Sequence, residues 1–408
     1  MRIFLHDFSG HPPQVRLSRE LACRGHEVMH SYAGDFLTPH GSLERQSDDP
    51  AGFAVRPISL GKPFVKSASL TRQMQELEYG RRLRRAMDTF APDVVVLANT
   101  PPASLEFARR GCRRRGIPFV YWLMDINSIG MRTILTKKLG VAGRLIGWGY
   151  RLLERRQLDG SDKIVAICEE FRDTLAEWGI DGNKIAVMPL WAPLDEVPLR
   201  PKANEWSRRH GLDQTTNVLY AGTLGRKHDP SGLSALARHY REREEVRIVV
   251  VSEGDGVRRI AGEQAADGLS NIVLLPFQPF DALPDVLATA DVFIGLLDDD
   301  AGGYCVPSKI LTYLCAGRPQ VGAMPETNRS AEVIRESGGG LVVPPAAPDA
   351  LIAAVDGLVG DPMQRKRLGD AARAYAEREF DIRRLGDQFD GYLREACDAS
   401  TATRLRTG

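Results

Sequence analysis

The chain has 408 residues, a length typical of two or three domains. Its composition is 43% hydrophobic and 26% charged, which is ordinary for a globular protein with a substantial core. The 54 basic and 53 acidic side chains give a net charge of +1. No overall field therefore favours nucleic acid, and the basic segments lack a nucleic-acid reading motif.

The six cysteines show neither close pairing nor metal-ligand spacing, and most lie in apolar segments. This pattern predicts buried free thiols in a reducing compartment. No apolar run reaches the roughly 18 residues that a membrane-spanning helix needs. The first residues also lack the long apolar core of a signal peptide. We therefore expect a cytoplasmic protein, with contact at a membrane surface still open.

Short apolar segments rich in valine and isoleucine alternate with helical patterns along the whole chain. In the first half the expected strands are IFLHDF, EVMHSYA, DVVVLAN, FVYWLMD, KIVAIC and IAVMPL. In the second half they are NVLYAG, RIVVVSE, NIVLLPF, DVFIGLL, QVGA and GLVVPP. Near-continuous apolar strands separated by helices predict parallel sheets that are covered on both faces.

A polar, proline-containing segment at residues 191–213 separates the two sets of strands, and the pattern restarts after it. We therefore expect an α/β protein with two Rossmann-like domains facing each other across a cleft. In such sheets, ligands bind beyond the carboxyl ends of the strands. The loops that follow the strands are thus the candidate functional segments.

The segment GGYCVPSKILTYLCAGRPQVG predicts a helix that begins at the proline and serine and ends at the next glycine. Lys309 lies in its first turn, where the helix dipole disfavours a cation unless an anion is near. Ser308 is the expected cap, with Thr312 one turn on and Tyr304 at the entry. The alternative is a solvated lysine beside an ordinary cap.

Three further loops in the second half carry glycine, cations or an aromatic side chain directly after a strand. The residues singled out there are Gly222, Thr223, Arg226, Lys227, Glu253 and Phe277. Glycine lets backbone amides approach an anion, and cations add charge. A simple tight turn and a core phenylalanine are the alternatives for the last two. Taken together, the loops predict a diphosphate-containing ligand in the cleft between the domains.

The stretch from residue 104 to 157 is strongly basic, with twelve basic and three acidic side chains. Within it, VAGRLIGWGYRLLERRQ has helical periodicity, with leucines and isoleucine on one face and arginines on another. This layout is that of a helix lying on anionic lipid. The alternative is a domain helix with its apolar face turned into the core and its arginines in solvent.

These segments resemble the retaining GT-B glycosyltransferases of the group 1 family. The segments that carry the likeness are GHPPQVRLSRELACRGHEV, SDKIVAICEEFRDTLAEWGIDGNKIAVMPLWAP, VLYAGTLGRKHD, VVVSEGDG, NIVLLPFQPFDALPDVLATADVFIGLL and VPSKILTYLCAGRPQVG. They follow the family's order and spacing over nearly the whole chain. More narrowly, LWAP and the helix start resemble the branch that assembles capsule, O-antigen or colanic-acid-type polysaccharide.

The resemblance implies an acceptor domain at 1–200 and a donor domain at 201–384. Residues 385–408 would form a helix that packs back on the first domain, followed by a loose tail. It also implies transfer of a sugar from a nucleotide-diphosphate sugar, with retention and without a metal or other cofactor. The acceptor would be a saccharide, and the basic first domain favours one linked to polyprenyl lipid at the inner membrane face.

By position in the family, the diphosphate would lie beside Gly222, Thr223, Arg226, Lys227 and Ser308, and the helix pattern adds Lys309. Phe277 would present its backbone to the base. Gly10, Gln14 and Asp125 would face the sugar and the acceptor, with Asp125 orienting the acceptor or taking its proton. A helix-cap role is the alternative for Asp125. The acidic run at residues 298–300 is interpreted as a solvated loop.

The sequence departs from the family at its usual pair of glutamates, eight positions apart, which falls on Tyr304 and Thr312. Thr312 retains a hydroxyl for a ribose, whereas Tyr304 is a doubtful catalytic group. A non-catalytic nucleotide-sugar-binding protein and a nucleotide-sugar epimerase of the same fold therefore stay open.

Overall fold

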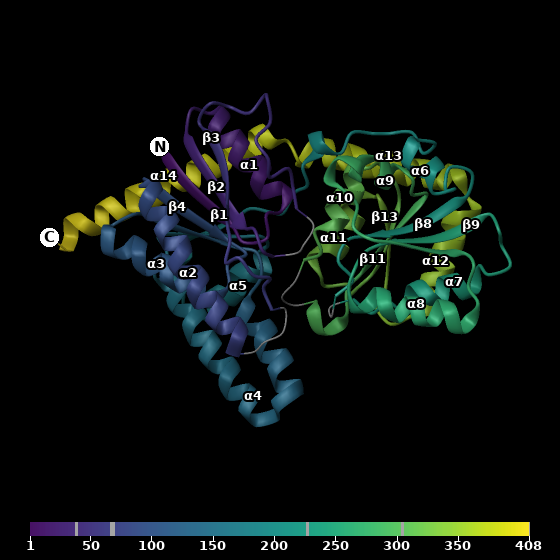
Figure 1. Cartoon of the computed structure of the whole chain (residues 1–408), viewed down its shortest axis with the longest axis horizontal. Coiled ribbons are helices and arrows are strands. Elements are labelled where there is room, and N and C mark those ends of the chain that lie inside the picture. The colour runs from purple at the N-terminus through teal and green to yellow at the C-terminus, as the bar shows by residue number, and fades with distance from the viewer. Residues whose placement is uncertain (37–39, 66–69, 226–227, 303–305, 408) are drawn as a thin grey trace. The chain divides into compact units, whose positions relative to one another are not determined.

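The computed structural model describes residues 1–36, 40–65, 70–225, 228–302 and 306–407. It divides into two compact units (Figure 1). Unit 1 comprises Met1–Leu190 and Ile382–Gly408, and unit 2 comprises Trp191–Asp381. The sequence interpretation had drawn the first boundary at residue 200 and the second at 384.

Unit 1 contains a parallel sheet of seven strands in its described part, in the order β3-β2-β1-β4-β5-β6-β7. The strands are β1 (Arg2–Asp7), β2 (Glu27–Ala33), β3 (Phe53–Ile58), β4 (Val94–Ala98), β5 (Phe119–Leu123), β6 (Lys163–Ala166) and β7 (Ile185–Val187). The helices are α1 (Pro12–Cys23), α2 (Leu70–Phe90), α3 (Pro102–Arg115), α4 (Asn127–Asp159), α5 (Glu169–Glu177) and α14 (Ile382–Thr407).

The predicted strands of unit 1 are confirmed, and β3 is the one that the sequence interpretation missed. Among the described strands it pairs with β2 alone, at the edge of the sheet. Arg56 and Pro57 interrupt its apolar pattern, and both are exposed. Because an edge strand leaves one ladder of backbone groups unpaired, it tolerates a proline that a central strand would not.

Unit 2 contains a parallel sheet of six strands in its described part, in the order β10-β9-β8-β11-β12-β13. The strands are β8 (Thr216–Ala221), β9 (Val246–Val251), β10 (Ile272–Leu275), β11 (Val292–Leu296), β12 (Gln320–Ala323) and β13 (Gly340–Val343). The helices are α6 (Glu205–Arg209), α7 (Ser231–His239), α8 (Asp255–Asp267), α9 (Leu283–Ala288), α10 (Lys309–Cys315), α11 (Arg329–Ser337), α12 (Pro348–Gly360) and α13 (Pro362–Glu379). All six predicted strands are confirmed.

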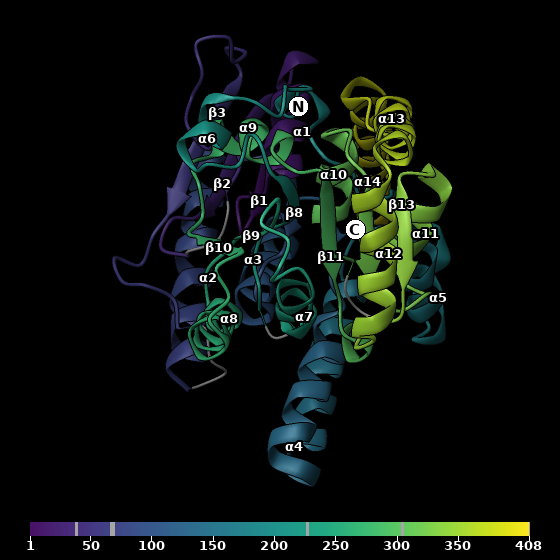
Figure 2. The same ribbon diagram turned by 90° about the vertical axis from the view of Figure 1, so that its right-hand side faces the viewer.

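Both sheets reverse their strand order beside the first strand, β1 in unit 1 and β8 in unit 2. This is the Rossmann arrangement, in which ligands bind beyond the carboxyl ends of the strands at the point of reversal. Figure 2 shows β8, β9 and β11 of unit 2 side by side, with α12 along the sheet. The fold therefore defines one candidate binding edge in each unit.

The C-terminal helix α14 packs on α1 and on the central strands of unit 1. The ring of Phe389 lies 4.9 Å from that of Trp122, and Asp390 accepts a hydrogen bond from His26 at 2.8 Å. The helix continues to Thr407, so the prediction of a loose tail after it is wrong. The last residues contain no glycine or proline before Gly408, and nothing stops the helix earlier.

The cysteine prediction is confirmed for Cys112, Cys168 and Cys315, which are buried free thiols. Cys23, the last residue of α1, is exposed instead, and Cys397 is partly buried. Cys305 lies outside the described residues.

Candidate functional site

In unit 2 the loops after β8, β9, β10 and β11 and the start of α10 share one edge of the sheet. The point of reversal lies between β8 and β11, its neighbour. Gly222, Thr223, Glu253, Phe277, Ser308, Lys309 and Thr312 all belong to these segments. The predicted residues Arg226, Lys227 and Tyr304 lie outside the described residues.

Gly222 forms the turn that leaves β8. Its φ of +125° is in the region that only glycine adopts without strain. A Cβ at this position would lie 3.4 Å from Cε of Lys309, and the amide of Gly222 donates to Val251 O at 3.0 Å. The glycine thus provides the turn beside which the lysine side chain lies. Thr223, the next residue, is exposed.

The Lys309 ammonium is held beside this turn by contacts with Tyr220 and Thr223. It lies over the ring of Tyr220, 4.1 Å from the ring centroid, and contacts the Tyr220 hydroxyl. It also donates to the carbonyl oxygen of Thr223 at 3.3 Å. Burial raises the pKa of Tyr220 well above its usual value, so the phenol is neutral and donates to the same carbonyl at 2.8 Å. The structure thereby fixes a cation at the tip of β8.

Helix α10 is tied to β8 by Tyr313, a residue that the sequence interpretation missed. Its hydroxyl accepts from Ala221 N and donates to Ala221 O, both at 3.0 Å. Its ring stacks on Phe293 of β11 at 3.9 Å. Because Tyr313 lies one turn after Lys309, these contacts place the first turn of α10 next to Gly222. A tyrosine on the apolar face of a helix gave no sign of this polar role.

The start of α10 differs from the prediction at Ser308. Its hydroxyl makes no capping hydrogen bond, and the residue is exposed. Its backbone is helical, with φ −62° and ψ −22°, whereas a capping side chain needs an extended backbone to reach back to the amides. Its carbonyl accepts from the amide of Thr312 at 3.4 Å, and Thr312 is partly buried. The Ser308 hydroxyl therefore does not cap this helix.

Glu253 and Phe277 lie in the loops that follow the neighbouring strands β9 and β10, and they meet at this edge. Glu253 is exposed and accepts a hydrogen bond from the Phe277 amide at 3.4 Å. Phe277 is only partly buried, so its alternative assignment to the core is wrong. A ligand that accepts a hydrogen bond from the Phe277 amide would take the place of the Glu253 carboxylate.

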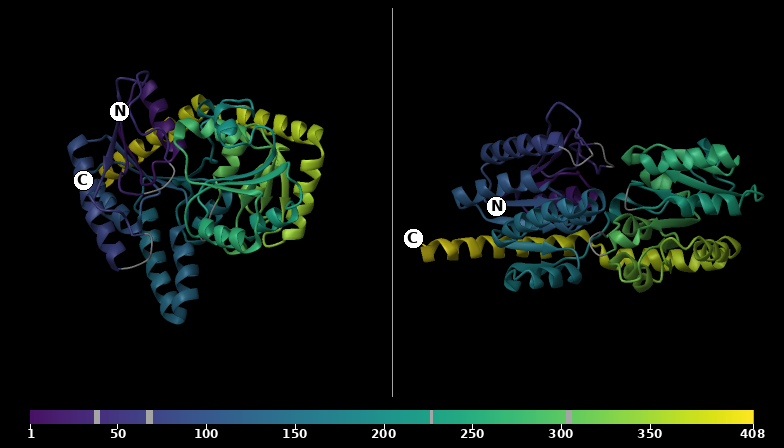
Figure 3. Two further views of the ribbon diagram at one scale, coloured as in Figure 1. Left: turned by 45° about the vertical axis from the view of Figure 1, so that its right-hand side comes forward. Right: turned by 90° about the horizontal axis from the view of Figure 1, so that it is seen from below.

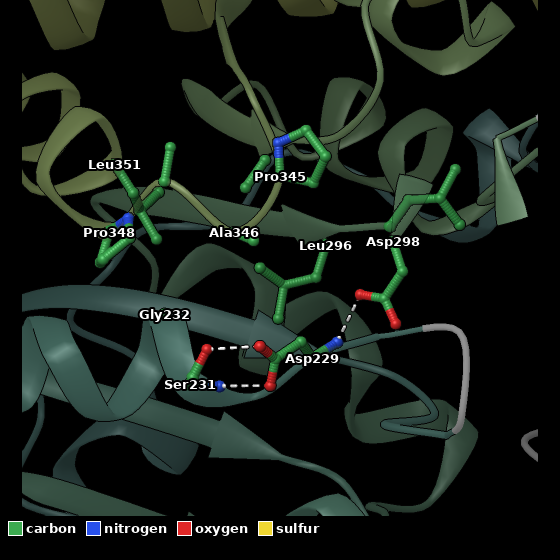
Figure 4. A pocket seen from close by; sticks show the side chains of 12 residues that line it. Asp229, Ser231, Gly232, Leu296, Asp298, Pro345, Ala346, Pro348 and Leu351 are labelled. Carbon is green, nitrogen blue, oxygen red and sulfur yellow. Dashed lines mark hydrogen bonds between the residues drawn. The ribbon is translucent and has the colours of Figure 1, made fainter. Parts of the chain in front are cut away.

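A hollow of about 370 Å³, including open solvent, lies at the same end of unit 2, and its polar groups are mainly oxygen acceptors (Figure 4). Asp298 accepts from Asp229 N at 2.8 Å, and Asp229 accepts from the Ser231 hydroxyl at 2.6 Å. Burial and then the neighbouring acidic groups raise the pKa of Asp298. Two carboxylates make this hollow unsuited to a diphosphate.

The same contacts correct the interpretation of the acidic run. Asp299 and Asp300 are exposed, as expected of a solvated loop, whereas Asp298 is partly buried and hydrogen-bonded. Its position directly beyond β11 turns its carboxylate toward the chain instead of toward solvent. Among the described residues, no group of three or more histidine, cysteine or acidic side chains is arranged to hold a metal ion.

In unit 1 the predicted residues Gly10 and Gln14 lie beyond β1, at the point of reversal. Gly10 has a φ of +66°, and a Cβ there would lie 2.9 Å from Leu43. Gln14 is buried, and its amide nitrogen lies 3.6 Å from the Met124 sulfur, while its amide oxygen has no hydrogen-bond partner. The structure thus brings Gln14 beside the loop that contains Asp125.

Asp125 is partly buried and is not the cap of α4, because Ile126 occupies that position. The first backbone amides of α4 donate instead to the buried carboxylate of Glu154, at 2.9 Å from Asn127 and 3.0 Å from Ser128. The alternative interpretation of Asp125 as a helix cap is therefore wrong.

A polar group that the sequence interpretation missed lies at the same edge. Asp7, fully buried at the end of β1, accepts from the His11 amide at 2.5 Å and from the Asn99 side chain at 2.7 Å. The Asn99 nitrogen lies 3.3 Å from the ring of His11, which is partly exposed. Asn99 has a φ of +50°, which places its side chain between the two. The sequence gives one sign of this polar group, because Asp7 ends the apolar strand β1 and Asn99 directly follows the apolar strand β4.

Two family models match successive parts of the chain. Residues 14–191 match a glycosyl transferase 4-like domain, and residues 215–361 match the glycosyl transferases group 1. The chain belongs to the group 1 glycosyltransferases. Its second matched region contains the edge with Gly222 and Lys309, and its first contains the edge with Gln14 and Asp125.

The curated relatives of this chain are distant in sequence. The putative colanic acid biosynthesis glycosyl transferase WcaI of Escherichia coli is 26% identical over 63% of this chain and 64% of the relative. A GDP-mannose-dependent monoacylated alpha-(1-6)-phosphatidylinositol monomannoside mannosyltransferase of Corynebacterium glutamicum is 26% identical over 48% of this chain and 52% of the relative. The chain thus spans less than two thirds of the length of each.

Solved structures confirm the predicted fold. HepE of Anabaena in complex with UDP-glucose has a TM-score of 0.70 at 16% identity, covering 97% of this chain and 99% of that chain. Sucrose-phosphate synthase from Thermosynechococcus elongatus has a TM-score of 0.72 at 14% identity, covering 98% and 100%. At these identities the likeness concerns the fold alone, which is the GT-B arrangement of two Rossmann-like domains.

Proposed function

We propose that this group 1 glycosyltransferase transfers a sugar from a nucleotide-diphosphate sugar to a lipid-linked saccharide during cell-surface polysaccharide assembly, with retention and without a metal ion. The names of two relatives support the substrate classes. One refers to colanic acid biosynthesis, and the other to dependence on GDP-mannose and to a phosphatidylinositol monomannoside.

The observation that carries the proposal is the Lys309 ammonium beside the Gly222 turn, at the reversal point of the unit 2 sheet. A fixed cation and a glycine turn suit the diphosphate of a sugar nucleotide. In our proposal Arg226 and Lys227, which follow the same turn in sequence, place further positive charge beside the anionic leaving group. Such stabilisation is often the largest single contribution to a group transfer.

The proposed reaction proceeds on one face of the sugar. The bond between the anomeric carbon and the diphosphate oxygen breaks while the acceptor oxygen bonds to the same face of that carbon. The acceptor proton passes to the departing phosphate oxygen, so no protein nucleophile is needed. Asp125 and His11 at the unit 1 edge are the proposed groups that orient the acceptor hydroxyl.

The location follows from the acceptor. A polyprenyl-linked saccharide requires the enzyme to work at the inner face of the cell membrane. None of the described helices is long and apolar enough to cross a membrane. We therefore propose peripheral attachment to that surface.

The test uses UDP-glucose and GDP-mannose as probes, with and without a chelator. We expect one of the two sugar nucleotides to raise the melting temperature of the protein. With a lipid-linked acceptor, its nucleoside diphosphate should be released. NMR of the product should show that the anomeric configuration of the donor sugar is retained. Loss of transfer on chelation would contradict the metal-independent mechanism. Nucleotide binding without transfer or hydrolysis would favour the non-catalytic alternative, and conversion of the donor sugar itself would favour an epimerase.

A further inference from the structure

Helix α4 is a hairpin of two helical arms that projects from the body of unit 1 (Figures 2 and 3). The arms meet at Gly140, whose φ of +56° and ψ of −125° are not helical. The sequence interpretation had recognised only the second arm. A hairpin of this kind leaves much of its surface without other elements of unit 1 to cover it.

The arms pack on each other through two glycines of the second arm. A Cβ at Gly143 would lie 2.0 Å from Leu135 O, and one at Gly147 would lie 2.9 Å from the Arg132 Cα. The contact uses glycines, and the large apolar side chains Leu145, Ile146 and Leu152 of the second arm are exposed. The alternative of a domain helix with its leucine face in the core is therefore wrong.

The base of the hairpin is firmly held. The buried Glu154 carboxylate on the second arm accepts two amides from the start of the first arm. The Gln157 side chain donates to Pro102 O at 2.7 Å, and Arg151 lies over the ring of Trp178 at 5.0 Å. These contacts fix the direction of the hairpin relative to the sheet of unit 1.

The outer surface of the hairpin is apolar. Six of the eleven large hydrophobic side chains that are exposed in the described part of the chain lie between residues 139 and 152. They are Leu139, Val141, Leu145, Ile146, Trp148 and Leu152. Leu145 is 68% exposed and Trp148 60%. Apolar clusters of this kind on a monomer's surface mark interaction sites.

The apolar surface extends onto the start of α2. The Gln73 side chain donates to the Tyr150 hydroxyl at 3.5 Å, which places the first turn of α2 beside the second arm. Leu70 and Met74 of that turn are also exposed. The surface thus includes two segments that are far apart in sequence.

The hairpin is also strongly cationic. Between Asp125 and Glu154 the sequence contains no acidic residue and five basic ones, namely Arg132, Lys137, Lys138, Arg144 and Arg151. Two copies of such a surface repel each other. Anionic lipid attracts it, at roughly 1 kcal/mol for each cation near the headgroups. Aromatic and aliphatic side chains then enter the boundary between headgroups and acyl chains.

We propose that the α4 hairpin, with the first turn of α2, is the surface by which this protein docks on a bilayer containing anionic phospholipid. The proposed function supplies the reason for docking, a lipid-linked acceptor. The binding itself needs neither donor nor acceptor, so the two proposals can fail separately.

The experiment is flotation with vesicles of phosphatidylcholine alone or with 30% phosphatidylglycerol, a mixture chosen at roughly the anionic content that gives a strong surface potential. We expect binding only to the anionic vesicles, weakened by salt. The double variant K138Q/R144Q should bind about 25-fold more weakly, at about fivefold per cation. The control R113Q/R114Q removes the same charge from the exposed end of α3 and should bind within about twofold of wild type.

A second pair of variants tests the apolar contact. L145Q/W148Q should lose at least about tenfold in vesicle affinity, the scale for keeping one large side chain out of the apolar layer. The control L199Q/M363Q makes the same kind of change at side chains of unit 2 that are 58% and 81% exposed, and should bind as wild type does. Trp148→Phe should remove the blue shift of tryptophan emission that vesicles cause.

Failure of the wild type to float with anionic vesicles at low salt would overturn the proposal. So would equal losses in the hairpin variants and their controls, because binding would then follow net charge alone. The proposal would also be overturned if the wild type formed a dimer and did not bind vesicles, and if L145Q/W148Q were a monomer. The surface would then be the contact with a second copy of the chain. The thermal shift with nucleotide should be the same in all variants, which shows that they fold and that donor binding is separate.

Discussion

Replacing Lys309 by methionine tests whether this side chain serves the diphosphate or only the fold. Methionine keeps much of the apolar stem but removes the ammonium from the ring of Tyr220 and the carbonyl of Thr223. The lost cation–π contact is worth about 0.5–1 kcal/mol. The lost hydrogen bond adds about 0.5–1.5 kcal/mol. We therefore expect the unliganded protein to unfold with a free energy lower by about 1–2.5 kcal/mol.

The expected effect on the reaction is larger. An ammonium about 4 Å from a phosphate charge interacts by about 4 kcal/mol at an effective dielectric constant of 20. Loss of one preorganised contact to a developing charge costs about 2.7–4 kcal/mol, or a hundredfold or more in rate. We therefore expect kcat/KM for sugar transfer to fall at least about a hundredfold in K309M. The thermal shift caused by the bound nucleotide should fall as well.

The matched control is Tyr220→Phe, which keeps the ring beneath the ammonium but removes the hydroxyl that contacts it. Its stability should drop by about 1 kcal/mol with less than a tenfold change in turnover, because the cation stays at the turn. Chemical denaturation without nucleotide and initial rates with donor and acceptor measure the two effects. Wild-type rates and nucleotide affinity in K309M, with only lower stability, would refute the reasoning.

Three further predictions follow from other parts of the structure. Burial lowers the pKa of His6 and His30 to about 3. Since the unfolded chain takes up these protons below pH 6.5, stability should be full above that pH and fall by about 1.4 kcal/mol per histidine at pH 5.5. Chemical denaturation at pH 5.5 and at a pH well above 6.5 checks this, and His30→Asn should remove half of the loss of stability. His11→Ala and Asp125→Asn should each lower transfer about tenfold to a hundredfold while leaving the nucleotide thermal shift unchanged, as expected of groups that act on the acceptor; an equal loss of nucleotide binding would contradict that assignment. A chelator should leave transfer rates within about twofold, because in the proposed mechanism fixed cations take the place of a metal ion.

Much of the fold was predictable because each central strand is a continuous apolar run. Strands β8 to β13 and all but one of β1 to β7 could be recognised in this way, since parallel strands covered on both faces have no polar side. The edge strand β3 carries Arg56 and Pro57 and gave no such signal. The Gly140 break in α4 was hidden as well, because glycine occurs both in helices and at turns.

The candidate site was predictable only in part. A glycine after a strand and a lysine at a helix start are local patterns, so Gly222 and Lys309 were found from sequence. The ties that place them together, from Tyr220 and Tyr313, join residues about ninety positions apart. The same holds for Asp7 and Asn99 in unit 1. No local pattern reports such contacts, because they depend on which strands become neighbours.

The sequence by itself determined the two α/β units, their family, and the segments that lie at the binding edges, because hydrophobic periodicity and turn residues act locally along the chain. The tertiary structure decided which polar groups meet and which apolar groups stay uncovered. It holds the Lys309 cation at the tip of β8 and leaves Leu145 and Trp148 of α4 exposed. Both outcomes depend on sheet order and on glycines that permit close approach, and these are properties of the folded chain.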